Sequence, residues 1–291
     1  MTLPSASAPP PITLKTLRRM AKDNHPFAAL TCYDATTARW LERAGVHVLL
    51  VGDTAAEVIL GLPSTIHMPL EVSLALTAAV KRGAPRTVVM GDMPFMSYQL
   101  SEDEAVRNAG RFLTEGLADV VKLEADASFA PVVAKMSRAG VPVCGHVGCR
   151  PQRAAMTGGY ASTGRTAETA RQVIDDAKAL VDAGAVMLLV EAVPGEVAEG
   201  IMSSCPGVPL VGIGAGRGCH GQILVLQDLL GLTQWQPGFA TPLANLGPAI
   251  EAAGKDWVSR VAARNVTDHR YEMEQPRESK PEKGPISKPG R

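Results

Sequence analysis

Ionisable side chains follow a series of short apolar runs in this sequence. They are Asp34, Asp53, Asp92, Lys122 with Glu124, His146 and Glu191. A single Asp after a strand is usually a helix N-cap, and we interpret Asp34 in this way because a helical pattern follows it directly. The remaining carboxyl groups would repel one another at a common edge unless a positive charge lay among them. A balancing cation is therefore expected there.

Two positive groups could supply that balance. Lys122 stands two residues before Glu124, so both side chains point to the same face of a strand. The other candidate is a divalent metal held by Asp53, Asp92 and Glu124. These residues offer only carboxylate oxygens, with no paired Cys or His, and such ligands suit Mg²⁺ better than Zn²⁺. Because Mg²⁺ keeps several waters, exchangeable positions would remain for a bidentate 2-oxo acid.

Two further side chains have more than one interpretation. His146, in the run Cys-Gly-His-Val-Gly, is a ligand, a hydrogen-bond donor to substrate, or a core histidine whose hydrogen bonds are satisfied. Glu191 ends the very apolar stretch 186–190, where a partly desolvated carboxylate can serve as a general base. The alternative for Glu191 is a salt bridge to Lys122 or Arg165.

Two glycine-containing segments resemble functional loops. Gly212–Gly216 reads Gly-Ile-Gly-Ala-Gly, but it lacks both the Lys-Ser/Thr of a phosphate loop and the full GxGxxG spacing. We predict a tight turn after a strand. Thr157–Arg165 is polar and glycine-rich, which is typical of a mobile lid.

The apolar runs themselves predict the fold. They are 27–34, 46–53, 87–95, 118–126, 142–148, 185–194 and 209–216, with 223–227 as a weaker eighth candidate. Each has the length of a strand buried on both faces, as in a parallel sheet. Helical patterns alternate with them at 35–44, 69–82, 101–115, 128–139, 166–183 and 196–203. Glycines that suit left-handed C-terminal caps follow five of these patterns, at Gly45, Gly83, Gly116, Gly140 and Gly184. Ser101 and Glu104 have the spacing of a capping box.

Repeated strand–helix units with polar residues at the strand ends favour an α/β fold of the (β/α)₈ TIM-barrel type. A doubly wound open sheet is the alternative. The 291-residue length fits one such barrel, and apolar residues make up 46% of the chain. We predict a disordered leader over 1–12, one barrel catalytic domain over 13–273, and a disordered tail over 274–291, which is rich in Pro, Lys and Glu.

Bulk composition narrows the classes of partner. Lys plus Arg and Asp plus Glu are both 29, so no basic surplus predicts nucleic-acid binding. No apolar run approaches the ~18 residues of a membrane span, and the N-terminus lacks the order of a secretory signal. The five cysteines are scattered, which predicts buried free thiols in a reducing cytoplasm.

Taken in order, the motifs are similar to those of ketopantoate hydroxymethyltransferases, a family within the phosphoenolpyruvate mutase/isocitrate lyase-like barrels. The resemblance runs from about Thr13 to about Tyr271. Its motifs are Thr31–Asp34, Val51–Asp53, Arg82–Pro85, Gly91–Met96, Val121–Glu124, Pro142–His146, Gly158–Tyr160, Glu191–Pro194, Gly212–Gly216 and Gly221–Gln222.

This resemblance implies a reaction and a set of roles. A hydroxymethyl group passes from 5,10-methylenetetrahydrofolate to 3-methyl-2-oxobutanoate, giving 2-dehydropantoate for pantothenate and coenzyme A biosynthesis. It implies that Asp53, Asp92 and Glu124 hold Mg²⁺ and that Glu191 is the catalytic base. The residues implied to bind substrate are Asp53, Thr54, Asp92, Lys122 and His146. The family is cytoplasmic and forms homo-oligomers, typically decamer-like rings.

Several loop positions depart from the family pattern. Thr54 stands where the family has Ser, and the other departures include His67, Asp126, Arg150, Thr163 and His220. Two other functions are therefore weighed: a 2-oxo acid lyase or aldolase of the same barrels, and a non-catalytic paralogue. The Lys-Lys-Cys-Gly-His run of such lyases is absent from the sequence. The intact carboxylates and Lys122 favour the hydroxymethyltransferase.

Overall fold

The structure is a computed structural model that describes residues 10–267, 271 and 273. The chain divides into two compact units, Met1–Gly247 and Pro248–Arg291. The predicted tail over 274–291 and residues 1–9 of the predicted leader lie outside the described residues. The predicted domain boundaries stay a prediction.

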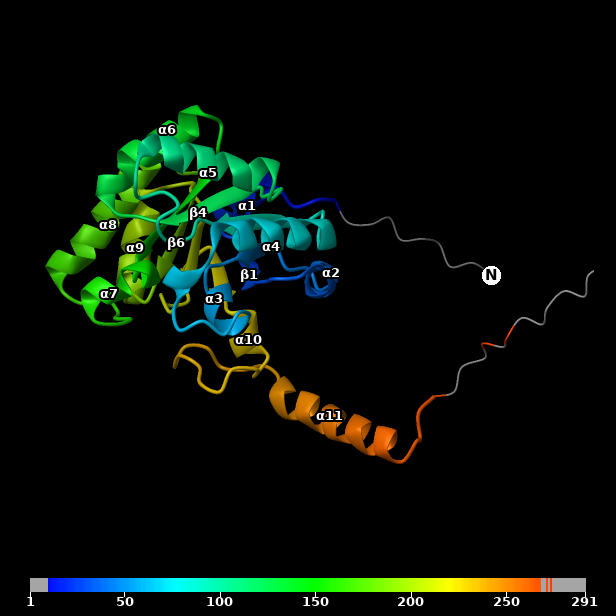
Figure 1. The fold of residues 1–291 in the computed structure, drawn as a ribbon. Coiled ribbons are helices and arrows are strands. Elements are labelled where there is room, and N and C mark those ends of the chain that lie inside the picture. The colour runs from blue at the N-terminus through cyan, green and yellow to red at the C-terminus, as the bar shows by residue number, and fades with distance from the viewer. Residues whose placement is uncertain (1–9, 268–270, 272, 274–291) are drawn as a thin grey trace, which may run out of the picture. The chain divides into compact units, whose positions relative to one another are not determined.

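The first unit is a closed barrel of eight parallel strands in the order β1 to β8 (Figure 1). The strands are β1 (Phe27–Thr31), β2 (Val48–Val51), β3 (Val88–Asp92), β4 (Val120–Glu124), β5 (Val143–Gly148), β6 (Met187–Glu191), β7 (Leu210–Ile213) and β8 (Gly221–Leu224). Each strand pairs with the next along the chain, and β8 closes onto β1 with Phe27 opposite Gly221. The barrel prediction is confirmed, and the open-sheet alternative is wrong.

Helices follow the strands and lie outside them, as Figure 1 shows for α4, α5, α6, α8 and α9. The α-helices of this unit are α1 (Leu14–Lys22), α2 (Ala35–Arg43), α3 (Ala55–Val58), α4 (Leu70–Gly83), α5 (Glu102–Thr114), α6 (Ala130–Arg138), α7 (Ala154–Thr157), α8 (Ala167–Asp182), α9 (Gly195–Ser204) and α10 (Leu226–Leu229). Short 3₁₀ turns span η1 (Thr65–His67), η2 (Ala127–Phe129) and η3 (Pro151–Arg153). Asp34 and Ser101 accept backbone hydrogen bonds as the N-caps of α2 and α5.

Because side chains alternate along each strand, the core has two parts, one inside the barrel and one between the strands and the outer helices. Alternate residues such as Val48 and Leu50 face the barrel interior, where Leu17 of α1 packs among them. Their neighbours Leu49 and Val51 pack beneath the outer helices. Burial on both faces explains why the strands read as uninterrupted apolar runs. Because α1 joins the interior cluster beside early strand residues, it closes the end of the barrel opposite to the strand carboxyl ends.

Two local predictions are wrong. The eighth strand spans Gly221–Leu224, whereas 223–227 was expected. A Cβ on Gly221 would lie 2.4 Å from the Phe27 ring, so the strand begins with a glycine, which an apolar pattern does not reveal. Three of the predicted cap glycines are left-handed, namely Gly45, Gly140 and Gly184, with φ of 84°, 86° and 107°. Gly83 and Gly116 are not, and after α5 Leu117 takes that conformation at φ 57°.

The second unit contains most of α11, which spans Leu246–Ala262 and enters this unit at Pro248. Ile250, Trp257, Val258 and Val261 recur at helical spacing along one face of it. In the described part of the chain, no helix is long and apolar enough to cross a membrane. All five cysteines are buried and free, as predicted.

Candidate active site

A buried ion pair lies at the carboxyl ends of β3 and β4. Lys122 Nζ donates to both carboxylate oxygens of Asp92, at 2.7 Å each. The same Asp92 Oδ2 accepts from the backbone N–H of Asp53 at 3.0 Å. All three residues are at most 4% exposed. Lys122 is thus the positive charge that balances this group of carboxylates.

The charges of this group shift one another's protonation. Burial, followed by the negative charge of Asp92, raises the pKa of Asp53 to about 7. Burial and the charge of Asp53 raise the pKa of Glu124 well above its usual range. Burial opposes the charged form of Lys122, but the carboxylates of Asp92, Asp53 and Glu124 outweigh it and raise the pKa of that ammonium. The site therefore favours the charged form of Lys122 and the protonated forms of Asp53 and Glu124 unless more positive charge enters.

Gln152 links two of the carboxylates, a role that the sequence analysis missed. Its side-chain amide donates to Asp53 Oδ2 at 2.9 Å, and its backbone N–H donates to Glu124 Oε2 at 3.0 Å. The amide oxygen accepts from Tyr98 OH at 2.8 Å and from Gln99 Nε2 at 3.2 Å, which fixes its orientation. Its place after Pro151, in the loop that follows β5, was the available signal.

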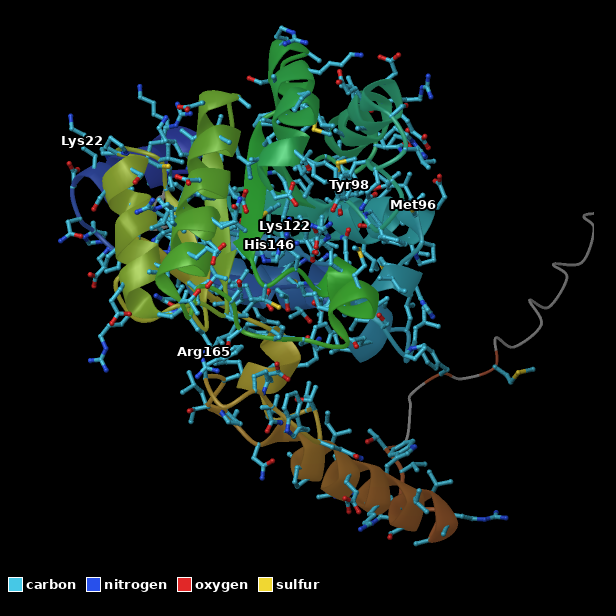
Figure 2. The ribbon with its side chains drawn as sticks, turned by 90° about the vertical axis from the view of Figure 1, so that its left-hand side faces the viewer. Lys22, Met96, Tyr98, Lys122, His146 and Arg165 are labelled. Carbon is cyan, nitrogen blue, oxygen red and sulfur yellow. The ribbon has the colours of Figure 1, made fainter. Side chains whose placement is uncertain are left out.

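His146 and Glu191 meet at the edge of this cluster. Figure 2 shows His146 near Lys122, on the neighbouring strand. His146 Nε2 lies 3.4 Å from Glu191 Oε2, and its Nδ1 lies 3.9 Å from Glu124 Oε1. Burial and then the charge of Lys122 lower the pKa of His146, which favours the neutral ring. Neither ring nitrogen makes a well-oriented hydrogen bond among the described residues, so His146 is not a satisfied core histidine.

The carboxylate oxygens of Asp53, Asp92 and Glu124 are the type of ligand that a hard divalent cation prefers. Glu124 Oε1 is buried and has no hydrogen-bond partner among the described residues. An oxygen in that condition gains most from a cation or a donor brought by a ligand. Yet no three Asp, Glu, His or Cys side chains of the described residues converge closely enough to enclose a metal as they stand.

Two cavities adjoin the cluster. The smaller, of about 50 Å³, is lined by Asp53, Asp92, Lys122, Glu124 and His146 among others. The larger, of about 710 Å³, opens beside it, and its walls include the aromatic residues Tyr160, Trp235 and Phe239. Five residues line both cavities, namely Thr54, Pro151, Glu191, Ile213 and Val225. Glu191 therefore faces a small charged chamber on one side and a large apolar one on the other.

The segment predicted to be a lid forms one wall of the larger cavity. Tyr160, Ala161, Ser162 and Arg165 line it. Tyr160 OH lies 3.4 Å from Glu57 Oε1, and Thr163 N–H donates to Ala192 O at 3.1 Å. The mobility of this segment stays a prediction. Of the segment predicted as a tight turn, Gly212 and Ile213 end β7, and the chain bends after them, with φ of 57° at Gly214 and 77° at Gly216.

Sequence comparison assigns this site to a family. The profile described as ketopantoate hydroxymethyltransferase matches residues 11–268. The chain belongs to this family. Curated relatives named 3-methyl-2-oxobutanoate hydroxymethyltransferase include one from Pyrobaculum aerophilum, 46% identical over 82% of this chain and 91% of that protein. Another, from Carboxydothermus hydrogenoformans, is 42% identical over 89% of this chain and 94% of its own length.

Solved structures share the fold of this ketopantoate hydroxymethyltransferase family member at low sequence identity. A phosphonopyruvate hydrolase is 13% identical with a TM-score of 0.59, covering 87% of this chain and 88% of that one. A 2,3-dimethylmalate lyase, described as a PEP mutase/isocitrate lyase superfamily member, is 19% identical with a TM-score of 0.57, covering 90% and 91%. These likenesses concern the barrel alone.

Four of the positions named above as departures from the family pattern, Thr54, Asp126, Arg150 and Thr163, follow the carboxyl ends of β2, β4 and β5. Asp126 pairs with Arg150 at 2.6 Å and with Arg153 at 2.8 Å, so two of the altered positions contact each other. His220 Nδ1 accepts from the Leu210 N–H at 3.1 Å, below the site. Thr54 lines both cavities. His67 is an exposed residue of η1.

Proposed function

We propose that this chain is a folate-dependent hydroxymethyltransferase. It transfers a hydroxymethyl group from 5,10-methylenetetrahydrofolate to 3-methyl-2-oxobutanoate, giving 2-dehydropantoate. Membership of the family supports this reaction. The observation that carries it is Glu191, which stands between a small charged cavity suited to a 2-oxo acid and a large apolar cavity suited to a folate.

The residues divide the reaction between them. Glu191 takes the proton from C3 of the 2-oxo acid, and the neutral ring of His146, 3.4 Å away, lines the charged chamber beside it. Lys122 presents its ammonium to the developing enolate oxygen, and Thr54 and Asp53 line the chamber in which that oxygen lies. The enolate carbon then forms a carbon–carbon bond to the methylene carbon, and water supplies the hydroxyl oxygen of the product as the two bonds from that carbon to folate nitrogens break. One proton of the water and the proton held by Glu191 pass to the two folate nitrogens, so tetrahydrofolate leaves.

The metal of the proposal is Mg²⁺, held by Asp53, Asp92 and Glu124. Their oxygen donors and the unpartnered Glu124 Oε1 support this assignment. Bound there, Mg²⁺ supplies Lewis acidity that lowers the energy of an enolate next to a carboxylate.

We also propose a cellular location, a class of partner and an oligomeric state for this protein. Five buried free thiols fit a reducing cytoplasm, and equal numbers of acidic and basic residues fit small-molecule partners rather than nucleic acid. We propose a homo-oligomer, decamer-like by family resemblance. Supporting it, the described residues of the second unit leave Ile250, Trp257 and Val258 of α11 uncovered.

An assay of purified protein with both substrates tests the reaction. We expect 2-dehydropantoate to form only when Mg²⁺, 3-methyl-2-oxobutanoate and methylenetetrahydrofolate are all present. The matched control replaces the folate donor with tetrahydrofolate, which lacks the one-carbon unit. Absence of product from folded, metal-supplied protein would contradict the proposal.

A further inference from the structure

The larger cavity contains a carboxylate with no place in the chemistry above. Glu57 lies on α3, one helical turn beyond Thr54, and both side chains line the cavity. The Glu57 side chain is half-buried, and the hydrogen bond recorded for it is the long contact to Tyr160 OH at 3.4 Å. A carboxylate has room for about four donors, so most of the acceptor capacity of Glu57 remains available to a ligand.

The surroundings of Glu57 indicate what kind of ligand suits it. Burial raises the pKa of Glu57 while the Tyr160 hydroxyl acts against that shift, so the charged form lacks adequate solvation. The cavity walls around it carry apolar and aromatic side chains, among them Val58, Trp235 and Phe239. A flat, largely apolar ring with N–H donors along one edge would supply hydrogen bonds to Glu57 and apolar contacts to the cavity walls.

We propose that Glu57 recognises the pterin ring of the folate co-substrate through its 2-amino and N3–H groups. This inference rests on the function proposed above. The two groups form an edge of parallel N–H donors, which matches the two oxygens of a carboxylate as an arginine fork does. The cavity of about 710 Å³ lies within the range of small-molecule sites.

The position of Glu57 fits the direction of transfer. Glu57 stands three positions after Thr54, a rise of roughly 5 Å along the helix, and Glu191 lies on the wall shared with the charged chamber. The one-carbon unit of methylenetetrahydrofolate lies on the side of the pterin away from its amino edge. A pterin held by that edge at Glu57 therefore directs the methylene carbon toward Thr54 and Glu191.

Ligand binding measured by calorimetry tests this contact by changing first the ligand and then the protein. The ligands are tetrahydrofolate and an analogue whose 2-amino group is replaced by methyl. We expect wild-type protein to bind the analogue roughly 10- to 100-fold more weakly, the range for a hydrogen bond to a charged group. Glu57→Gln should lose a similar factor for tetrahydrofolate and should discriminate the two ligands less than about threefold. Glu196→Gln, an exposed carboxylate outside the cavity, is the matched control and should behave as wild type.

The outcomes separate this inference from the proposed function. Equal binding of both ligands by wild-type protein overturns the pterin contact while leaving folate use intact, and this comparison needs no variant. Discrimination that persists in folded Glu57→Gln also overturns it and leaves Glu57 as a contact of Tyr160 alone. Wild-type protein that binds neither ligand overturns the proposed folate dependence and the inference with it.

Discussion

At the scale of single residues, the site depends on how its carboxylates are held. Gln152 bonds Asp53 with its side chain and Glu124 with its backbone, and it leaves Glu124 Oε1 unpartnered. Groups that orient metal ligands typically contribute ~10- to 100-fold to metal affinity. Gln152 is therefore a positioning residue for the two carboxylates that are proposed to bind Mg²⁺.

We predict that Gln152→Ala weakens Mg²⁺ binding by roughly 10- to 100-fold, measured by calorimetric titration. The amide that fixes Asp53 Oδ2 is lost, so that carboxylate becomes free to turn. Gln99→Ala is the matched control, because it removes one bond to Gln152 and touches neither carboxylate. Its effect should stay below tenfold. Wild-type affinity in Gln152→Ala would exclude the positioning role.

The raised pKa of Asp53 predicts how the metal-free protein responds to pH. Between its usual value of 3.8 and about 7, the folded state holds a proton that the unfolded chain has released. Asp53 therefore contributes fully to the unfolding free energy below its usual pKa of 3.8, and this contribution is lost as pH rises through about 7. In EDTA, the unfolding free energy of wild type minus that of Asp53→Asn should fall between pH 4 and 8, by at most ~4 kcal/mol. Urea denaturation across this range measures it, and a flat difference contradicts the shift.

At the scale of elements, α2 and α4 approach each other at one glycine. A Cβ on Gly83 would lie 2.4 Å from Ala35 O, at the first residue of α2. This contact explains why glycine ends α4 although its backbone is not left-handed. Gly110 within α5 offers the opposite case, since nothing lies within 4 Å of its added Cβ.

We predict opposite effects for the same substitution at these two glycines. Gly83→Ala should lower the unfolding free energy by ~1–3 kcal/mol through overpacking. Gly110→Ala should raise it by about 0.5–1 kcal/mol, because alanine costs less chain entropy in a helix. Chemical denaturation of both variants checks this, and a stabilised Gly83→Ala would show that α2 and α4 can separate freely.

Sequence patterns predicted the elements whose burial leaves a clear apolar pattern. The strands were found because both faces of each are covered, which leaves unbroken apolar runs such as Val88–Met90. β8 was misplaced because Gly221 and Gln222 resemble a turn, whereas Gly221 is required by Phe27 on the neighbouring strand. α11 was missed because Pro248 and Gly254 suggest breaks, although Pro248 lies in the first turn, where its missing N–H costs little.

The site was predictable only where strand ends determine it. Asp92, Lys122 and Glu124 could be placed together because parallel strands deliver their carboxyl ends to one rim. Gln152 and Asp53 are 99 residues apart, and Tyr160 and Glu57 are 103 apart. No local pattern encodes such pairs, since they depend on how two loops fold over the same end of the barrel.

At the scale of the whole molecule, the proposed oligomer makes a prediction for α11. Trp257 and Val258 lie on its apolar face, and the exposed Ser259 lies on the opposite face. Wild-type protein should sediment as a species larger than one chain, and Trp257→Lys should shift it toward smaller species. Ser259→Ala should sediment as wild type. A wild-type monomer across micromolar concentrations contradicts the homo-oligomer.

In the proposed reaction, this barrel removes the C3 proton of a 2-oxo acid with Glu191 as the base. The most direct measurement is exchange of that proton of 3-methyl-2-oxobutanoate in D₂O, followed by NMR with Mg²⁺ and without folate. We predict exchange by wild-type protein and a rate lower by about 10²- to 10⁴-fold in Glu191→Gln, because an amide is no base at neutral pH. Glu196→Gln should exchange as wild type does. Failure of folded, metal-supplied wild type to exchange, or equal exchange by Glu191→Gln, would contradict the account.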